Sequence, residues 1–144
     1  MNLIVKKLSD NAHIPTIQTS GSAGYDLYSS IDGNIAENSR GLVSTDIIVK
    51  IPKNHCGLIW PRSGYSVKNG IETGAGVIDS DYEGEIKVLL HNHGNRNFEY
   101  TVGMRIAQLL IVPIATPNII EVNEIIPESD PNSRGTGGFG STGM

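Results

Sequence analysis

Short apolar runs that alternate with polar residues recur along this chain, and almost none has the spacing of a helix. Runs of this kind, rich in β-branched residues and bounded by turn residues, are typical of β-strands. Strands are predicted at residues 3–5, from 26 onward, and at 41–51, 56–60, 85–91, 97–102 and 106–112. One short helix is predicted over 65–69, following Pro61-Arg62-Ser63-Gly64 and ending at Gly70. The pattern therefore predicts an all-β sandwich or barrel.

Length and composition narrow the class of protein. A chain of 144 residues is long enough for one domain with a sizeable core and too short for two. No apolar run approaches the ~20 residues that span a bilayer, so a soluble protein without membrane contact is expected. The formal net charge of -4 argues against direct binding of nucleic acid, which favours a basic face. Cys56 is the only cysteine, which suits a reducing compartment such as the cytoplasm or nucleus.

The stretch from Gly74 to Gly84 has the composition of a ligand-binding turn. Its glycines leave bare backbone that a flat ligand can approach, the ring of Tyr82 can cover that ligand, and the carboxylate of Asp79 can reach beyond it. We interpret it as a hairpin-like turn that leads into the strand at 85–91. A tight turn with solvated acids explains this stretch equally well when it is considered alone.

Two other stretches suit phosphate. Arg62 offers a planar fork of donors, and Ser63 offers a hydroxyl and backbone N–H groups near the start of the predicted helix. Ser63 could instead be an ordinary helix cap. The tail, residues 133–144, is too rich in glycine to hold a shape unaided, so a partner must order it, and Arg134 with the hydroxyl residues could fold around phosphate. A floppy terminus is the alternative.

Five stretches taken together resemble the five motifs of the trimeric dUTPase family, the deoxyuridine 5'-triphosphate nucleotidohydrolases. The matching stretches are Ser22-Ala23-Gly24-Tyr25-Asp26-Leu27, Pro61-Arg62-Ser63-Gly64, Gly76-Val77-Ile78-Asp79-Ser80-Asp81-Tyr82-Glu83-Gly84, Gly103-Met104-Arg105-Ile106-Ala107-Gln108-Leu109 and Arg134-Gly135-Thr136-Gly137-Gly138-Phe139-Gly140-Ser141-Thr142-Gly143. They occur in the family's order, at about its spacing, and span nearly the whole chain. Each motif alone is modest, whereas five in register are a strong signal.

The resemblance implies a fold, an assembly and a reaction. The fold would be a distorted jelly-roll or β-barrel, and the assembly a homotrimer in which all three chains build each active site. Residues 1–132 would form the barrel, and residues 133–144 a flexible glycine-rich lid that is swapped onto a neighbouring subunit. The reaction would be the hydrolysis of dUTP to dUMP and pyrophosphate with Mg2+, which limits uracil incorporation into DNA and supplies dUMP for dTMP synthesis.

The resemblance also implies roles for individual residues. Asp79 matches the aspartate that activates water for attack on the α-phosphate, and Asp26 would contact Mg2+ through water. Tyr82 would pack against deoxyribose and exclude a ribose hydroxyl, while main-chain groups from Gly76 to Tyr82, in the central turn of residues 74–84, and at Lys87 would read the uracil edge. The implied substrate-binding residues are Arg62, Ser63, Gly64, Gly76, Val77, Ile78, Asp79, Tyr82, Lys87, Gln108, Arg134, Phe139, Gly140, Ser141 and Thr142.

Two positions depart from the family pattern, and two other functions compete. Met104 stands where an acid usually precedes the arginine of the fourth motif, and Lys87 stands where glycine is frequent. A dCTP deaminase of the same fold would need a catalytic glutamate against the cytosine ring, and Glu83 and Glu85 are the only glutamates near the central turn. A nucleotide-gated interaction protein would bind dUTP without turnover, although the complete catalytic set argues against it.

Overall fold

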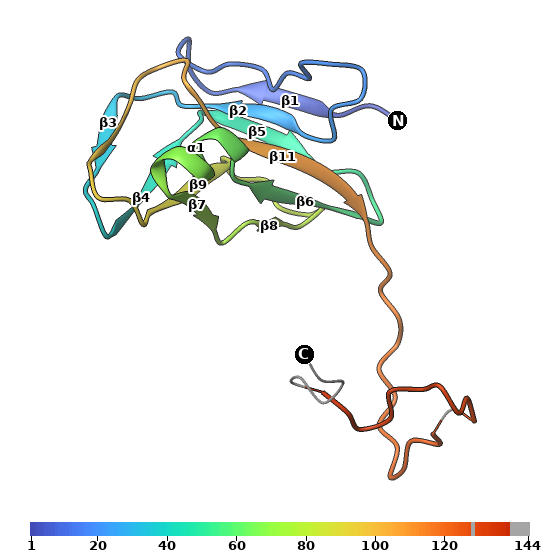
Figure 1. Ribbon diagram of the computed structural model, residues 1–144. Helices are drawn as coiled ribbons and strands as arrows, with labels where there is room; N and C mark the ends of the chain where they lie inside the picture. The colour runs from blue at the N-terminus through green and yellow to red at the C-terminus, as the bar shows by residue number, and fades with distance from the viewer. Residues whose placement is uncertain (128, 139–144) are drawn as a thin grey trace.

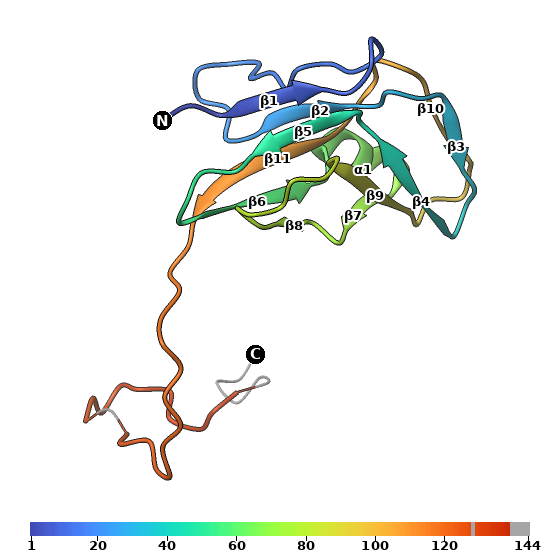
Figure 2. The same ribbon diagram turned by 180° about the vertical axis from the view of Figure 1, so that it is seen from behind.

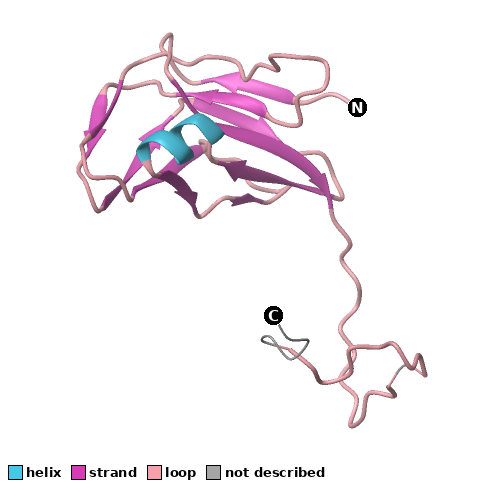
Figure 3. Ribbon diagram, viewed as in Figure 1, coloured by secondary structure: helices cyan, strands magenta, loops and turns pink. Residues whose placement is uncertain are grey.

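The computed structural model describes residues 1–127 and 129–138. Within these residues the chain forms eleven strands and one helix, which confirms the predicted all-β class (Figure 1; Figure 3). The described residues include no helix that is long and apolar enough to cross a membrane. The elements are β1 (Ile4–Lys7), β2 (Tyr25–Tyr28), β3 (Gly33–Ile35), β4 (Ser39–Ser44), β5 (Ile47–Lys50), β6 (His55–Trp60), α1 (Ser63–Asn69), β7 (Ile71–Gly74), β8 (Val77–Ile78), β9 (Lys87–Asn92), β10 (Phe98–Tyr100) and β11 (Arg105–Pro113).

The strands pair, all antiparallel, into small sheets that surround one apolar core. One sheet has the order β2-β11-β6-β8 and another the order β4-β9-β7, while β1 pairs with β5 and β10 with β3. Apolar side chains from these sheets point inward and form a single cluster, which includes the fully buried Leu27, Val43, Val49, Ile86, Leu90 and Leu109. This jelly-roll-like arrangement makes β11 a central strand, because it pairs with β2 on one side and with β6 on the other.

The segment predicted as one strand over residues 41–51 is two strands in different sheets. β4 ends at Ser44 and β5 begins at Ile47, and between them Asp46 has a φ of 52°. Aspartate adopts this left-handed region more readily than most residues, so the chain can turn from its pairing with β9 to its pairing with β1. The prediction of one continuous strand was wrong, because the run of β-branched residues does not mark this bend.

Residues 74–84, which we call the central turn, connect two sheets and are not a two-stranded hairpin. β7 ends at Gly74 and pairs with β9, whereas β8 pairs with β6. Ala75, with a φ of 45°, makes the bend between them. Gly76 then passes close to β6, where a Cβ atom would lie 2.7 Å from the carbonyl oxygen of Ile59. β9 begins at Lys87, two residues later than predicted.

After β11 the chain leaves the barrel. Residues 114–127 and 129–138, which we call the C-terminal arm, contain no helix or strand, and they extend away from the sheets in both views (Figure 1; Figure 2). The arm carries exposed β-branched side chains, with Ile119 99% and Ile126 90% exposed. Exposed apolar side chains on a segment without a helix or strand are a typical feature of interaction surfaces.

Candidate active site

Asp26, on β2, lies between two arginines. Its Oδ1 atom lies 3.6 Å from Nε of Arg62, and its Oδ2 atom lies 3.3 Å from Nη1 of Arg105. Asp26 is only 8% exposed, so the two ion pairs compensate a carboxylate that has lost most of its hydration. We call Asp26, Arg62, Arg105 and Gln108 the arginine cluster. Its formal charge is positive although the whole chain has a net charge of -4, and two guanidinium forks suit phosphate oxygens.

The register of β11 assembles this cluster. Gln108 lies opposite Asp26 on β2 and opposite Trp60 on β6, and its Nε2 donates a hydrogen bond of 3.0 Å to the carbonyl oxygen of Pro61. Gly24 leaves room for Gln108, because a Cβ atom there would lie 2.5 Å from Oε1 of that side chain. Trp60 is 55% exposed at the end of β6. Residues from the first, second and fourth matching stretches therefore meet in one place.

Arg62 links β6 to α1. It has extended backbone angles, φ -82° and ψ 129°, and it is the N-cap of α1 without a side-chain cap hydrogen bond. The alternative interpretation of Ser63 as the cap is therefore wrong, since Ser63 is the first helical residue. The helix ends with Gly70 in the left-handed conformation, as predicted. Arg62 also donates from Nη1 to the carbonyl oxygen of Arg105, at 3.3 Å, and its guanidinium lies 5.2 Å from the ring centroid of Tyr65. Ser63 and Gly64 are exposed beside it.

A cavity of about 310 Å³ lies against the central turn. The predicted residues that line it are Val77, Ile78, Asp79, Tyr82 and Lys87, together with Leu42, Ala75, Glu85 and Leu89. The turn is closed by a hydrogen bond of 3.2 Å from the backbone N–H of Tyr82 to the carbonyl oxygen of Asp79. Asp79 is exposed at the cavity, so its carboxylate is accessible to a ligand and to water.

The arginine cluster and Asp79 lie near opposite ends of β6. β8 runs antiparallel to β6 with Ile78 opposite Gly57, so Asp79 leaves β8 near the start of β6, whereas Arg62 follows its end. From Cys56 to Arg62 the chain is extended, and six residues at the rise of a strand span about 20 Å. One chain therefore does not bring Asp79 to Arg62.

The remaining predicted residues lie elsewhere or outside the described residues. Arg134 is exposed on the C-terminal arm, the segment that extends away from the sheets (Figure 1). The predictions for Phe139, Gly140, Ser141 and Thr142 fall outside the described residues. Met104, the departure in the fourth matching stretch, packs against the core and accepts a hydrogen bond of 2.9 Å from the N–H of Ser29 through its carbonyl oxygen.

Two residues of this region were not identified as site residues from the sequence. Arg105 pairs with Asp26 across 79 positions of the chain, a contact that no local pattern reveals, although Arg105 stands within the fourth matching stretch. Glu85 lines the central-turn cavity, and its Oε2 atom lies 3.4 Å from Nζ of Lys87. Its Oε1 atom accepts a hydrogen bond of 3.1 Å from the backbone N–H of Asp46, at a bend that the sequence did not predict.

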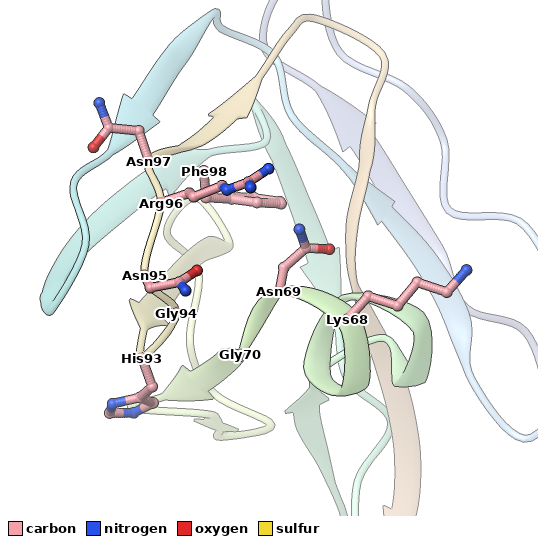
Figure 4. A pocket seen from close by; sticks show the side chains of 9 residues that line it. All are labelled: Lys68, Asn69, Gly70, His93, Gly94, Asn95, Arg96, Asn97 and Phe98. Atoms are coloured by element: carbon pink, nitrogen blue, oxygen red, sulfur yellow. The ribbon is translucent and has the colours of Figure 1, made fainter.

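A larger cavity, of about 490 Å³, lies between the end of α1 and the connection from β9 to β10 (Figure 4). Asn69, Asn95 and Arg96 point toward one another there, whereas Lys68 points away. None of the predicted site residues lines this cavity, and no carboxylate does. His93 lines it, but it lacks the aspartate on which the expected chemistry depends, so the cavity of the central turn, which Asp79 lines, is the better candidate for the reaction.

No metal cage of protein side chains is visible in the part of the chain that the structure describes. Across residues 1–127 and 129–138, no three His, Cys, Asp or Glu side chains are grouped so that they could hold a metal ion. Asp26 uses its two oxygens for arginines, yet an ionised carboxylate has about four lone-pair sites, so it can also accept hydrogen bonds from water.

The chain is similar to known proteins over nearly its whole length. Residues 10–143 match the family model described as dUTPase. The deoxyuridine 5'-triphosphate nucleotidohydrolase of Fowlpox virus (strain NVSL) is 51% identical over 140 residues, which cover 97% of this chain and 96% of that protein. The protein of the same name from Saccharomyces cerevisiae (strain ATCC 204508 / S288c) is 48% identical over 141 residues, which cover 98% and 94%.

Solved structures resemble this chain as well. The dUTPase of Staphylococcus bacteriophage 80alpha with dUpNHpp has a TM-score of 0.90 and 30% sequence identity, and the match covers 99% of each chain. The D95N mutant dUTPase from phage phi11 of S. aureus, described with a structural Mg(II) ion, has a TM-score of 0.81 and 28% identity, covering 86% of this chain and 98% of that one.

Proposed function

The chain belongs to the dUTPase family and is a deoxyuridine 5'-triphosphate nucleotidohydrolase, and on that premise we propose that Asp79 activates the attacking water in a site shared between subunits. The exposed carboxylate of Asp79 beside the central-turn cavity is the observation that carries the proposal. As the water oxygen attacks the α-phosphorus, Asp79 accepts its proton. The bond from that phosphorus to the bridging oxygen breaks, and pyrophosphate leaves with that oxygen while dUMP remains.

The arginine cluster would hold the triphosphate. Arg62 and Arg105 place two positive charges in a partly buried region, where they stabilise the negative charge that the triphosphate carries. Ser63 and Gly64 are exposed beside Arg62, so a hydroxyl and main-chain groups are within reach of the same phosphates. Because a carboxylate is a weak base, positioning and charge neutralisation would supply most of the acceleration.

Mg2+ fits the residues that are present. Asp26 is the carboxylate nearest to the arginines and keeps lone pairs for water, so it would contact the ion through a water molecule. The ion's direct ligands would be phosphate oxygens and water, which agrees with the lack of a three-residue cage in the described part of the chain. When bound, Mg2+ would neutralise charge on the triphosphate.

The central turn would select the nucleoside. Main-chain groups between Gly76 and Tyr82, and at Lys87, border a cavity large enough for a uracil ring, and the Tyr82 ring would pack against deoxyribose. A pocket of fixed shape has no room for the methyl group of thymine, and the donors that match uracil oppose the amino group of cytosine. dUTP hydrolysis of this selectivity would limit uracil in DNA and supply dUMP for dTMP synthesis.

A homotrimer would bring the two parts of the site together. Since about 20 Å of β6 separates Asp79 from Arg62 within one chain, the central turn of one subunit would face the arginine cluster of a neighbour. Residues 133–144 would act as a lid on another subunit, where Arg134, Phe139, Gly140, Ser141 and Thr142 close over the substrate and exclude water. The exposed apolar side chains of the C-terminal arm support this exchange.

The deaminase alternative would have to use Glu83 or Glu85, the glutamates near the central turn. Glu85 pairs with Lys87 at 3.4 Å, and Glu83 is 84% exposed and pairs with Lys50 at 3.9 Å. The match to deoxyuridine 5'-triphosphate nucleotidohydrolases over nearly the whole chain favours dUTP hydrolysis over deamination.

Mixed trimers test the shared site. Two variants, Asp79→Asn and Arg62→Gln, would each be inactive alone. For the test they are co-expressed in equal amounts and carry different affinity tags. If each site takes Asp79 and Arg62 from different chains, about one site in four of a random mixture is intact, and about a quarter of wild-type dUTP hydrolysis returns. The matched control replaces the second chain by one that carries both substitutions, which leaves no intact site. A mixture no more active than its parents, despite trimers that carry both tags, would contradict the shared site.

A further inference from the structure

We propose that Glu85 is a positioning residue for sugar selection, because it fixes Tyr82 to the bend between β4 and β5. The inference rests on the proposed function, in which the Tyr82 ring packs against deoxyribose. Glu85 itself touches no substrate in this scheme and acts through Tyr82.

The main chain of Glu85 holds the end of the Tyr82 side chain. The hydroxyl of Tyr82 donates a hydrogen bond of 2.9 Å to the carbonyl oxygen of Glu85. The ring of Tyr82 lies over Gly84, where a Cβ atom would come within 2.6 Å of its Cζ atom. The ring is thus held at its hydroxyl end by Gly84 and Glu85. A side chain at position 84 would displace the ring from the cavity.

The side chain of Glu85 in turn fixes its own main chain. Its Oε1 atom accepts a hydrogen bond of 3.1 Å from the backbone N–H of Asp46, and its Oε2 atom lies 3.4 Å from Nζ of Lys87. The Glu85 side chain is 19% exposed, so its hydrogen bond from Asp46 is partly shielded from water. The Lys87 side chain is 44% exposed, so the ion pair contributes less. Without this carboxylate the N–H of Asp46, at a bend between two strands, would lose its acceptor.

The bend at Asp46, which Glu85 contacts, is held by several other interactions. The carboxylate of Asp46 accepts a hydrogen bond of 2.6 Å from the hydroxyl of Ser9. Ile86, next to Glu85, is fully buried, and its N–H donates to the carbonyl oxygen of Ile47 at 2.8 Å. The hydroxyl of Thr45 donates to the carbonyl oxygen of Ile86. Glu85 therefore links the ring of Tyr82 to residues that are anchored in the core.

The consequence concerns selectivity more than turnover. A ring held at its hydroxyl end would leave no space for a ribose 2'-hydroxyl, whereas a ring free to shift would admit one. The phosphates and the attacking water are held by other residues, so they would be affected little. Loss of Glu85 should thus reduce the preference for dUTP over UTP while leaving kcat for dUTP nearly unchanged.

The experiment compares Glu85→Ala with wild type on dUTP and UTP. We expect the ratio of kcat/KM for dUTP to that for UTP to fall about tenfold, which corresponds to the loss of one hydrogen bond, with kcat for dUTP within about twofold of wild type. Glu85→Gln should restore most of the ratio, because its amide oxygen still accepts from Asp46. Glu83→Ala is the matched control, since that neighbouring carboxylate is 84% exposed, and it should leave the ratio unchanged.

A double-mutant cycle with Tyr82→Phe separates this mechanism from a general loss of stability. Because Glu85 acts through the hydroxyl of Tyr82, Glu85→Ala should change the dUTP:UTP ratio little in the Tyr82→Phe background. The same tenfold change in both backgrounds would overturn the inference, and so would equal losses on both nucleotides that leave the ratio intact. A wild-type protein without dUTP hydrolysis would instead contradict the proposed function. In that event the relative affinities for dUpNHpp and its ribonucleotide counterpart, measured on the same variants, still decide the role of Glu85.

Discussion

The arginine cluster and the central turn reach their geometry by different routes. Asp26 is 8% exposed and is held between Arg62, which follows β6, and Arg105 on β11, so the pairing of strands distant in sequence defines its position. Asp79 is exposed and Tyr82 is 44% exposed, and both are held by bonds within and just beyond a single turn. The geometry of the arginine cluster thus depends on strand pairing, whereas that of the central turn depends on hydrogen bonds close to the turn and on one distant contact, between Glu85 and Asp46.

This difference determines which property a substitution in each region should change. A substitution in the arginine cluster changes a partly buried charge network, so it should alter protein stability and the binding of every triphosphate. Asp79 and Tyr82 in the central turn are exposed to water. Their substitution should therefore leave the free energy of unfolding unchanged and alter turnover or nucleotide choice. Pairs of substitutions, one in each region, therefore test whether the two regions differ in this way.

The largest effect is expected for Asp79→Asn. Removal of the base should lower kcat for dUTP by ~10²-fold or more, while the affinity for dUpNHpp, measured by calorimetry, stays close to wild type because the amide keeps the size of the side chain. Asp81→Asn, a neighbouring exposed acid of the same turn, is the control. Wild-type turnover in Asp79→Asn would remove this carboxylate from the mechanism.

The next effect is on stability and concerns Asp26→Asn. Loss of the carboxylate between Arg62 and Arg105 leaves two partly buried cations without their counterion, which should lower the free energy of unfolding by about 2 kcal/mol. Urea unfolding at one fixed protein concentration measures it. Asp79→Asn should change this free energy by less than about 0.5 kcal/mol, because that carboxylate is exposed. Equal losses for the two substitutions would erase the proposed contrast.

A smaller effect is expected for Arg105→Gln. In the proposed site Arg105 is one of the two cations that would hold the phosphates, so its loss should raise KM about tenfold for dUTP and by a similar factor for UTP, leaving the preference between them unchanged. The exposed Arg40 provides the control substitution, Arg40→Gln. A changed dUTP:UTP preference in Arg105→Gln would show that the arginine cluster also reads the sugar, contrary to the division between the two regions.

The sequence predicted what depends on local pattern. The β class followed from short alternating runs, and the end of α1 followed from Gly70, whose left-handed conformation stops a helix. The positions of the five matching stretches identified the family, which the comparisons confirm. The roles of Asp79 and Arg134 stay predictions, since their neighbours in the proposed site belong to other subunits.

What the sequence could not predict depends on contacts between distant residues. The bend at Asp46 interrupts a continuous β-branched run, and only the pairing of β4 with β9 and of β5 with β1 reveals it. The contact of Arg105 with Asp26 arises from the register of β11 against β2. Glu85 resembles any surface acid in the sequence, and its partner at position 46 is 39 residues away. Long-range register of this kind leaves no mark on local periodicity.

Trp60 gives the molecule an optical reporter of its own. It is the single tryptophan of the chain, and it lies half in water at the end of β6, opposite Gln108. Indole emission shifts to shorter wavelengths when water is removed from around the ring. The intrinsic fluorescence of the unlabelled protein should therefore register, in real time, any neighbouring chain or nucleotide that covers this edge of the barrel.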